Sequence, residues 1–87
     1  MNIYIGNLSY NVKESDLHQV MQDYGTVEST KLIIDRETRR SKGFAFVVMP
    51  NDEEARNAIR ELNGAEYAGR QMIVKEAISR NKSDKKL

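Results

Sequence analysis

The stretch Lys42–Met49, KGFAFVVM, restricts the possible folds of this chain more than any other part of it. It is short, rich in aromatic and β-branched residues, and followed by Pro50, which is typical of a β-strand. Because side chains alternate across a strand, Lys42, Phe44 and Phe46 are predicted to share one face, and the apolar residues between them form a face suited to a core. Two exposed rings beside a positive charge are the combination that binds unstacked bases and their phosphates.

A second strand with an aromatic residue is predicted over residues 2–5, Asn-Ile-Tyr-Ile, which alternate and are followed by Gly-Asn. Tyr4 then lies on the face opposite to Ile3 and Ile5. Taken alone, Tyr4 could be a partly buried strand residue with its hydroxyl in water. If this strand is a neighbour of the one with two phenylalanines, the three rings instead form one platform on which bases can stack.

A helix is predicted over residues 13–23, because apolar residues recur there at helical spacing and Gly25 follows them. Asn11 and Glu14 are three residues apart and are expected to form a capping box at its start. His18 lies off the apolar stripe, so we expect a solvated histidine on the helix surface.

The next predicted strand covers residues 26–34. Alternation predicts that Leu32 and Ile34 point to the core and that Lys31 and Ile33 lie on the opposite face. Lys31 would then lie beside the aromatic rings, where it could contact a phosphate or serve as an ordinary surface lysine.

The second half of the chain repeats this pattern. Asn51 and Glu54 predict a capped helix that ends before an Asn-Gly pair. Residues 70–76 predict a fourth strand in which Met72 and Val74 point inward. The order strand, helix, strand, strand, helix, strand predicts an α+β, ferredoxin-like βαββαβ fold with a four-stranded antiparallel sheet and both helices on one face.

Two motifs carry a resemblance to a known family. The strand Lys42–Met49 matches the pattern K/R-G-F/Y-G/A-F-V-x-F/Y of RNA-recognition motif (RRM) domains at every position except the last. Residues 3–8, IYIGNL, resemble the second motif of that family. The chain therefore resembles RRM proteins over residues 2–77, in particular the small single-RRM RNA-binding proteins of bacteria and the RRM of glycine-rich RNA-binding proteins. The exception is Met49, where the family has Phe or Tyr. Because Met49 is predicted to face the core, this difference should affect packing and not RNA contact.

Residues 35–42, DRETRRSK, resemble the connection Asp-Arg-x-Thr-Gly-Arg-Ser-Lys of the family, with Arg39 in place of glycine. Glycine adopts a positive φ at low cost and arginine does not, so the tip is expected to form a different turn or to be more mobile. The four cations of this loop predict an arm that closes over a single-stranded nucleic acid. A solvated charged hairpin is the alternative, especially for Arg36, which lies between Asp35 and Glu37.

The resemblance also implies roles for individual residues. Tyr4 and Phe44 would each stack a base, Phe46 would contact sugars between two nucleotides, and Lys42 would hold a phosphate. Further RNA contacts are expected from Arg39, Arg40, Lys31, Asn2, Lys75, Ala77 and Ser79. For the last four of these, a structural or solvent-exposed role is equally compatible with the sequence.

Charge is divided unevenly along the chain, although the formal net charge is only +1. Residues 29–49 and 70–87 carry net charges of +3 and +4, whereas residues 1–28 and 50–69 each carry −3. The basic segments coincide with the aromatic strand, its preceding loop and the C-terminus, and the acidic segments coincide with the predicted helices. Such polarity favours attraction of a nucleic acid.

Composition excludes several kinds of chemistry. Among 87 residues there is no cysteine and one histidine, which excludes disulfides, thiolate metal sites and histidine-based nucleophile pairs. We therefore expect a non-catalytic protein without a cofactor or metal. No apolar run approaches the length of a membrane span and no signal-peptide pattern is visible, so a cytoplasmic protein without a membrane partner is expected.

The expected partner is single-stranded RNA, single-stranded DNA is left open, and the protein is expected to be a monomer. The alternatives are an RRM that binds a peptide and self-association through the sheet. An enzyme of the acylphosphatase type would need an arginine-containing phosphate loop, which the turn at Gly6 lacks. Residues 1–77 are expected to form one RRM domain, and residues 78–87 a basic, disordered tail.

Overall fold

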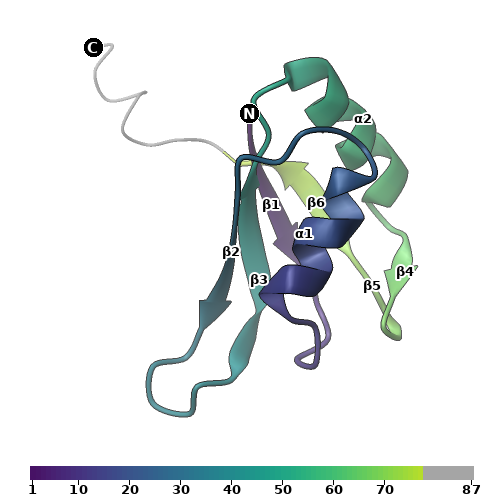
Figure 1. The fold of residues 1–87 in the computed structure, drawn as a ribbon. Helices are drawn as coiled ribbons and strands as arrows, with labels where there is room; N and C mark the ends of the chain where they lie inside the picture. Colours follow the sequence, from purple (N-terminus) through teal and green to yellow (C-terminus); the bar gives the residue numbers. More distant parts are fainter. Residues whose placement is uncertain (78–87) are drawn as a thin grey trace, which may run out of the picture.

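The computed structural model describes residues 1–77. Its elements follow in the order β1 (Asn2–Gly6), α1 (Glu14–Gln22), β2 (Ser29–Ile34), β3 (Ser41–Val48), α2 (Asp52–Leu62), β4 (Glu66–Tyr67), β5 (Arg70–Gln71) and β6 (Ile73–Glu76) (Figure 1). The strands β2, β3, β1 and β6 form an antiparallel sheet in that order, and β4 and β5 pair separately. Both helices lie on the same face of the sheet, which confirms the predicted ferredoxin-like α+β fold.

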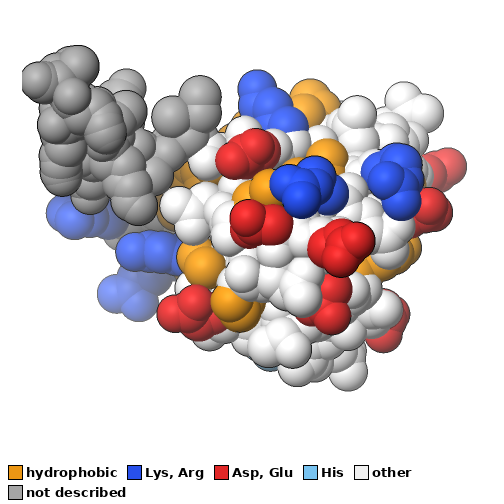
Figure 2. Space-filling model, turned by 90° about the horizontal axis from the view of Figure 1, so that it is seen from above, with side chains coloured by type: hydrophobic (Ala, Val, Ile, Leu, Met, Phe, Trp, Pro, Cys, Tyr) orange, Lys and Arg blue, Asp and Glu red, His pale blue; other side chains and the backbone are white. Residues whose placement is uncertain are grey.

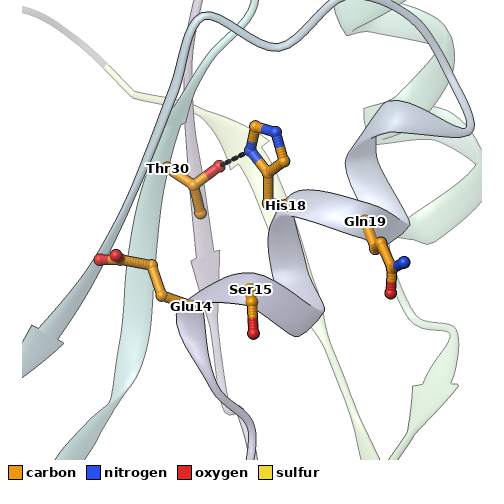
Figure 3. Close-up of a pocket in the computed structure, with 5 residues that line it drawn as sticks. All are labelled: Glu14, Ser15, His18, Gln19 and Thr30. Atoms are coloured by element: carbon orange, nitrogen blue, oxygen red, sulfur yellow. Dashed lines mark hydrogen bonds between the residues drawn. The ribbon is translucent and has the colours of Figure 1, made fainter.

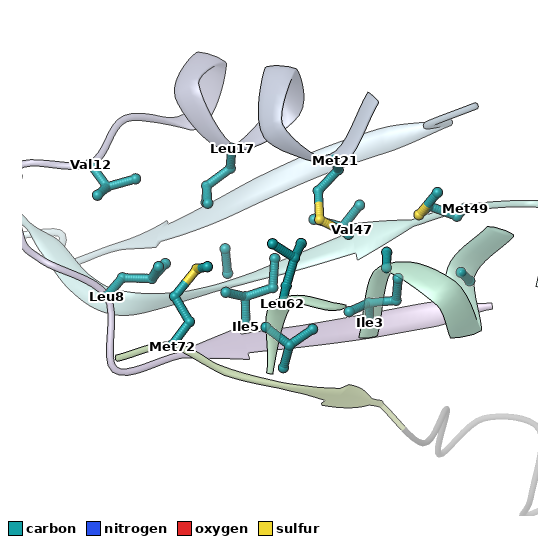
Figure 4. Packing of buried hydrophobic residues seen from close by; sticks show 14 residues of the cluster. Ile3, Ile5, Leu8, Val12, Leu17, Met21, Val47, Met49, Leu62 and Met72 are labelled. Atoms are coloured by element: carbon teal, nitrogen blue, oxygen red, sulfur yellow. The ribbon is translucent and has the colours of Figure 1, made fainter. Parts of the chain in front are cut away.

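The hydrophobic core lies between the sheet and the two helices (Figure 4). It combines the inward-facing side chains of the strands with the apolar stripes of the helices, and its buried members include Ile3, Ile5, Leu17, Met21, Ala45, Val47, Ala55, Ala58, Leu62 and Val74. Met49, directly after β3, is also fully buried, and its N–H donates to the carbonyl oxygen of Met1 at 3.0 Å. The prediction that Met49 faces the core is therefore confirmed.

The start of α1 differs from the prediction. The helix begins at Glu14, and the Asp16 carboxylate accepts a hydrogen bond from the Lys13 N–H at 3.0 Å. The Glu14 carboxylate accepts instead from the N–H of Leu32 on β2, at 2.9 Å. The predicted capping box of Asn11 and Glu14 is thus wrong, because β2 is an edge strand whose unpaired N–H groups offer the carboxylate a tertiary partner.

The start of α2 agrees with the prediction only in part. The Asn51 side chain caps the helix, accepting from the Glu54 N–H at 3.0 Å. The Glu54 side chain does not complete the box, because its carboxylate accepts from the N–H of Thr26 at 3.1 Å. Glu54 therefore joins α2 to the segment before β2, a contact that sequence spacing does not reveal.

The β2 strand is shorter than predicted and begins at Ser29. Leu32 is partly buried and packs against the core as expected, but Ile34 is 49% exposed. The prediction that Ile34 points into the core is wrong, because the β2–β3 hairpin extends beyond the start of α1, so no helix covers this end of the hairpin (Figure 1).

The predicted strand over residues 70–76 is interrupted at Met72. The short strand β5 pairs with β4 in a small hairpin, whereas β6 joins β1 in the main sheet. At the break, Met72 is buried, and its N–H donates to the carbonyl oxygen of Ala65 at 2.9 Å. The inward orientation predicted for Met72 and Val74 is confirmed, but the separate hairpin was not predicted.

Residues 78–87, expected to be a disordered basic tail, lie outside the described residues, and Ser79 is among them. Within residues 1–77, neither helix is long and apolar enough to cross a membrane. The same part of the chain contains no group of three or more His, Cys, Asp or Glu side chains that could hold a metal ion.

Candidate nucleic-acid interface

Three aromatic rings lie together on the sheet face that neither helix covers. Tyr4 on β1 is paired in register with Phe46 on β3, and Phe44 lies on the same face of β3. The ring centroids are 5.7 Å apart for Tyr4 and Phe46, 6.0 Å for Tyr4 and Phe44, and 6.1 Å for Phe44 and Phe46. The side chain of Phe46 is 38% exposed. We call these three residues the aromatic platform; the sheet order brings them together as predicted.

Gly6 allows the Tyr4 ring to lie close to the sheet. A Cβ atom added at Gly6 would come within 2.7 Å of two carbon atoms of the Tyr4 ring. Real Cβ atoms do not approach other atoms so closely, so any larger residue here would displace the ring. Gly6, the last residue of β1, therefore also determines where the Tyr4 ring of the platform can lie.

Gly43 allows β3 to bulge beside Phe44. Leu32 pairs with Ala45 and Ile34 pairs with Ser41, so β3 has three residues where β2 has one. Gly43 is the middle residue of these three and has a φ of +88°, a conformation that favours glycine.

Two lysines flank the aromatic platform on the outer strands. Lys31 on β2 lies opposite Phe46, and Lys75 on β6 lies opposite Tyr4. The Lys75 Nζ atom is 5.6 Å from the centroid of the Tyr4 ring, within the range of a cation–π interaction. Both side chains are exposed, so a positive charge is available on each side of the rings.

Asn2 and Ala77 lie at the end of the sheet beyond Tyr4. The Ala77 N–H donates to the Asn2 carbonyl oxygen at 2.8 Å, so these backbone groups are already paired. Asn2 pairs with Val48 on β3 and shares the face of Tyr4 by alternation. Both side chains are half-buried at the edge of the open face.

The hairpin loop between β2 and β3 is organised around Asp35. The Asp35 carboxylate accepts hydrogen bonds from the N–H groups of Glu37, at 2.8 Å, and Thr38, at 3.3 Å. The backbone N–H of Thr38, then that of Glu37, and the positive charge of Lys42 lower the pKa of the Asp35 carboxyl. The loop therefore has a defined turn that presents its cations on the surface.

Arg39 adopts the positive φ that a residue with a Cβ atom was expected to avoid. Its φ is +63°, and its N–H donates to the Asp35 carbonyl oxygen at 2.8 Å. For a residue with a Cβ this conformation costs about 1–2 kcal/mol. The hydrogen bonds that close the turn hold the arginine in this conformation.

Tyr10 is an exposed aromatic residue for which no role was predicted from the sequence. It lies in the loop between β1 and α1, and its side chain is 65% exposed. A surface groove is lined by Tyr10 together with Phe44, Lys42 and Arg40. The sequence signal was an aromatic residue in a polar loop, outside the apolar periodicity of the neighbouring elements.

His18 is less solvated than predicted. Its Nδ1 atom is 3.0 Å from the Thr30 hydroxyl oxygen, and the contact is partly buried (Figure 3). The ring is only partly exposed, because α1 packs against β2 and brings Thr30 next to it. These two residues line a shallow groove with Glu14, Ser15 and Gln19 of α1. This groove lies on the helix side of the sheet, away from the aromatic platform.

The acidic and basic segments of the sequence lie on different elements of the described structure. The first turn of α2 carries Asp52, Glu53 and Glu54, where negative charge is favourable for a helix. Figure 2 looks at the end of the molecule near the start of α2 and shows acidic and basic side chains interspersed. The β2–β3 hairpin, by contrast, carries four cations between residues 36 and 42, next to the platform.

Comparison with known proteins defines the class. The family described as RNA recognition motif matches residues 3–73. The chain therefore belongs to the RNA recognition motif family, as its two motifs indicated. It is 53% identical over 77 residues to the "Putative RNA-binding protein RbpD" of a Nostoc species. The aligned region covers 88% of this chain and 82% of that protein.

Solved structures show the same relationship. "RNA Binding Protein PG1" is 55% identical and superposes with a TM-score of 0.88, covering 92% of this chain and 96% of that one. The structure titled "Rna15 RRM with bound RNA (GU)" is 28% identical with a TM-score of 0.81, covering 95% of this chain and 93% of that one.

Proposed function

We propose that this protein binds single-stranded RNA on the open face of its sheet. The observation that carries the proposal is the aromatic platform, whose three centroids lie 5.7 to 6.1 Å apart with Lys31 and Lys75 on either side. Base stacking is worth about 1–3 kcal/mol per base and requires bases that are not already paired. The naming of the relatives as RNA-binding proteins supports the same function.

The orientations of the rings support different roles. The Tyr4 and Phe44 rings are inclined by 34°, so both can present a face to a base. The Phe46 ring is nearly perpendicular to the Phe44 ring, with an interplanar angle of 87°, so the two rings meet edge to face. We therefore assign base stacking to Tyr4 and Phe44, and contact with the sugars between two nucleotides to Phe46.

Phosphate contacts are assigned to the cations around the platform. Lys42, Arg39 and Arg40 come from the hairpin beside Phe44, and Lys31 and Lys75 come from the outer strands. Because such contacts release counterions, they would make the affinity depend on salt. Asn2 and Ala77 are proposed to contact bases at the far end of the sheet. Ser79, which lies outside the described residues, is also proposed to contact RNA. The protein is proposed to bind without catalysing a reaction.

The experiment compares wild type with Phe46→Ala and Phe46→Tyr by fluorescence anisotropy, using short single-stranded RNA pools at low and high salt. Phe46→Ala is expected to lose about tenfold or more in affinity, while Phe46→Tyr retains it because a ring remains. Circular dichroism establishes that each variant is folded. Equal binding by all three proteins, together with loss of all affinity at high salt, would reject the platform and favour the peptide-binding alternative.

A further inference from the structure

Tyr10 is the most exposed large apolar side chain among the described residues. Its loop is held against β3, because the Leu8 N–H donates to the Gly43 carbonyl oxygen at 2.9 Å. The Tyr10 ring packs next to Gly43, where an added Cβ would lie 3.2 Å from its Cε1 atom. One part of the ring is therefore supported by the β3 backbone, and the rest is available to a ligand.

Two surface grooves meet at Tyr10. The first runs beside Lys42 to Phe44, which is a member of the aromatic platform. The second runs along the helix side of the β2–β3 hairpin and includes Ile34 and Arg39. Arg40 lines both grooves. The surface is thus continuous from the platform, past the start of β3, to Tyr10.

The charge of these grooves suits a polyanion. Arg39, Arg40 and Lys42 contribute positive charge around Tyr10. The two acidic residues that line the grooves already accept backbone hydrogen bonds, Asp35 within the hairpin and Glu14 from β2. An aromatic ring beside arginines is the arrangement that stacks a base and holds its phosphate.

We infer that Tyr10 is a further stacking position for single-stranded RNA, reached from Phe44 along the first groove, with Arg40 and Lys42 holding the intervening phosphate. This inference rests on the proposed function of the platform. An acidic peptide would meet the same cations, but the continuity of the groove with the platform favours the same RNA strand. The RNA then leaves the sheet at the Phe44 end and bends around the start of β3.

The test uses single-stranded RNA pools of about three and about seven nucleotides, the shorter one sufficient for the platform alone. Tyr10→Ala is expected to lose about five- to tenfold in affinity for the longer pool and less than about twofold for the shorter pool. Tyr10→Phe is expected to behave as wild type. Arg40→Ala should also weaken binding mainly to the longer pool, whereas Arg56→Ala on α2 removes the same charge away from the grooves and should have little effect.

The outcomes separate the two proposals. If wild type binds neither pool, both the proposed function and this inference fail. If wild type depends on Phe46 but Tyr10→Ala binds the longer pool as tightly as wild type, the inference is overturned and the platform stands. If Tyr10→Ala does not fold, photo-crosslinking of wild type to the longer RNA containing 4-thiouridine decides: adducts at Tyr10 support the inference, and adducts confined to the platform overturn it.

Discussion

The aromatic platform and the β2–β3 hairpin are neighbours on the same surface, but different interactions hold them in place. Behind the platform, Ile5 on β1 and Ala45 on β3 are buried in the core, so the strands that carry the rings are supported by tertiary packing. In the hairpin, residues 36–40 are all exposed, and the turn depends on local hydrogen bonds to Asp35.

This difference predicts two separable contributions to RNA binding. The proposed stacking on the platform would depend on rings whose positions are set by the core, and it would be largely independent of salt. The hairpin would contribute through its positive charge, and that contribution would weaken as salt screens it. Substitutions in the core, beside the rings and in the hairpin should therefore affect stability and binding in different proportions.

The largest effect is expected from Ile5→Ala, which removes support behind the platform. Truncating a fully buried isoleucine should lower the free energy of unfolding by about 2–5 kcal/mol. RNA affinity, measured where the variant is still folded, should change by less than about threefold because the rings remain. Urea unfolding followed by circular dichroism, with anisotropy at low temperature, measures both quantities. A stability loss well below 1 kcal/mol would contradict the claim that core packing supports the strands of the platform.

Gly6→Ala tests whether the position of the Tyr4 ring matters. The added Cβ would overlap the ring, so the ring should move and RNA affinity should fall by about three- to tenfold. As the control, Gly6→Ala is also introduced into the Tyr4→Ala variant. Without the ring, the added methyl group should cause no further loss of affinity. Equal losses from Gly6→Ala with and without the Tyr4 ring would show that the glycine acts independently of it.

Arg39→Gly should stabilise the hairpin. Glycine adopts the positive φ of this position without strain, so the free energy of unfolding should rise by about 1 kcal/mol. Arg36→Gly removes the same charge from the same loop, at a residue without a positive φ, and should not stabilise the protein. Thermal unfolding of both variants measures the difference. Both variants should lose part of the salt-dependent affinity, and equal stability changes in the two would argue against strain at Arg39.

The smallest effect concerns the charge of Asp35. Its pKa is lowered in the folded protein, so its charged form contributes stability above its unfolded-state pKa, and this contribution is lost as the pH falls through the lower folded-state pKa. Asp35→Asn should therefore be slightly less stable than wild type at neutral pH, and the gap should close at acidic pH. Glu37→Gln, which removes the same charge from the same hairpin, serves as the control in thermal unfolding between pH 7 and about pH 2. A gap for Asp35→Asn that persists unchanged at the lowest pH would contradict the role of its charge.

Local pattern determined the order of the two helices and of the four strands of the main sheet, and the orientation of most strand residues. Alternation in β1 and β3 predicted that Tyr4, Phe44 and Phe46 face away from the core, because the side-chain period of a strand is a property of the backbone alone. The known topology of a βαββαβ chain then predicted that β1 and β3 are neighbours. The fold and the platform could therefore be predicted without coordinates.

Tertiary structure decided the features that depend on partners far away in the sequence. The carboxylates of Glu14 and Glu54 do not complete helix caps. They accept hydrogen bonds from the N–H groups of Leu32 and Thr26, respectively, because these N–H groups compete with the helix ends for the carboxylates. The contact of Tyr10 with the bulge at Gly43, and hence its place beside the platform, follows from the packing of one loop against a distant strand. Such contacts have no period in the sequence, so residue spacing predicts the elements but not which side chains meet between them.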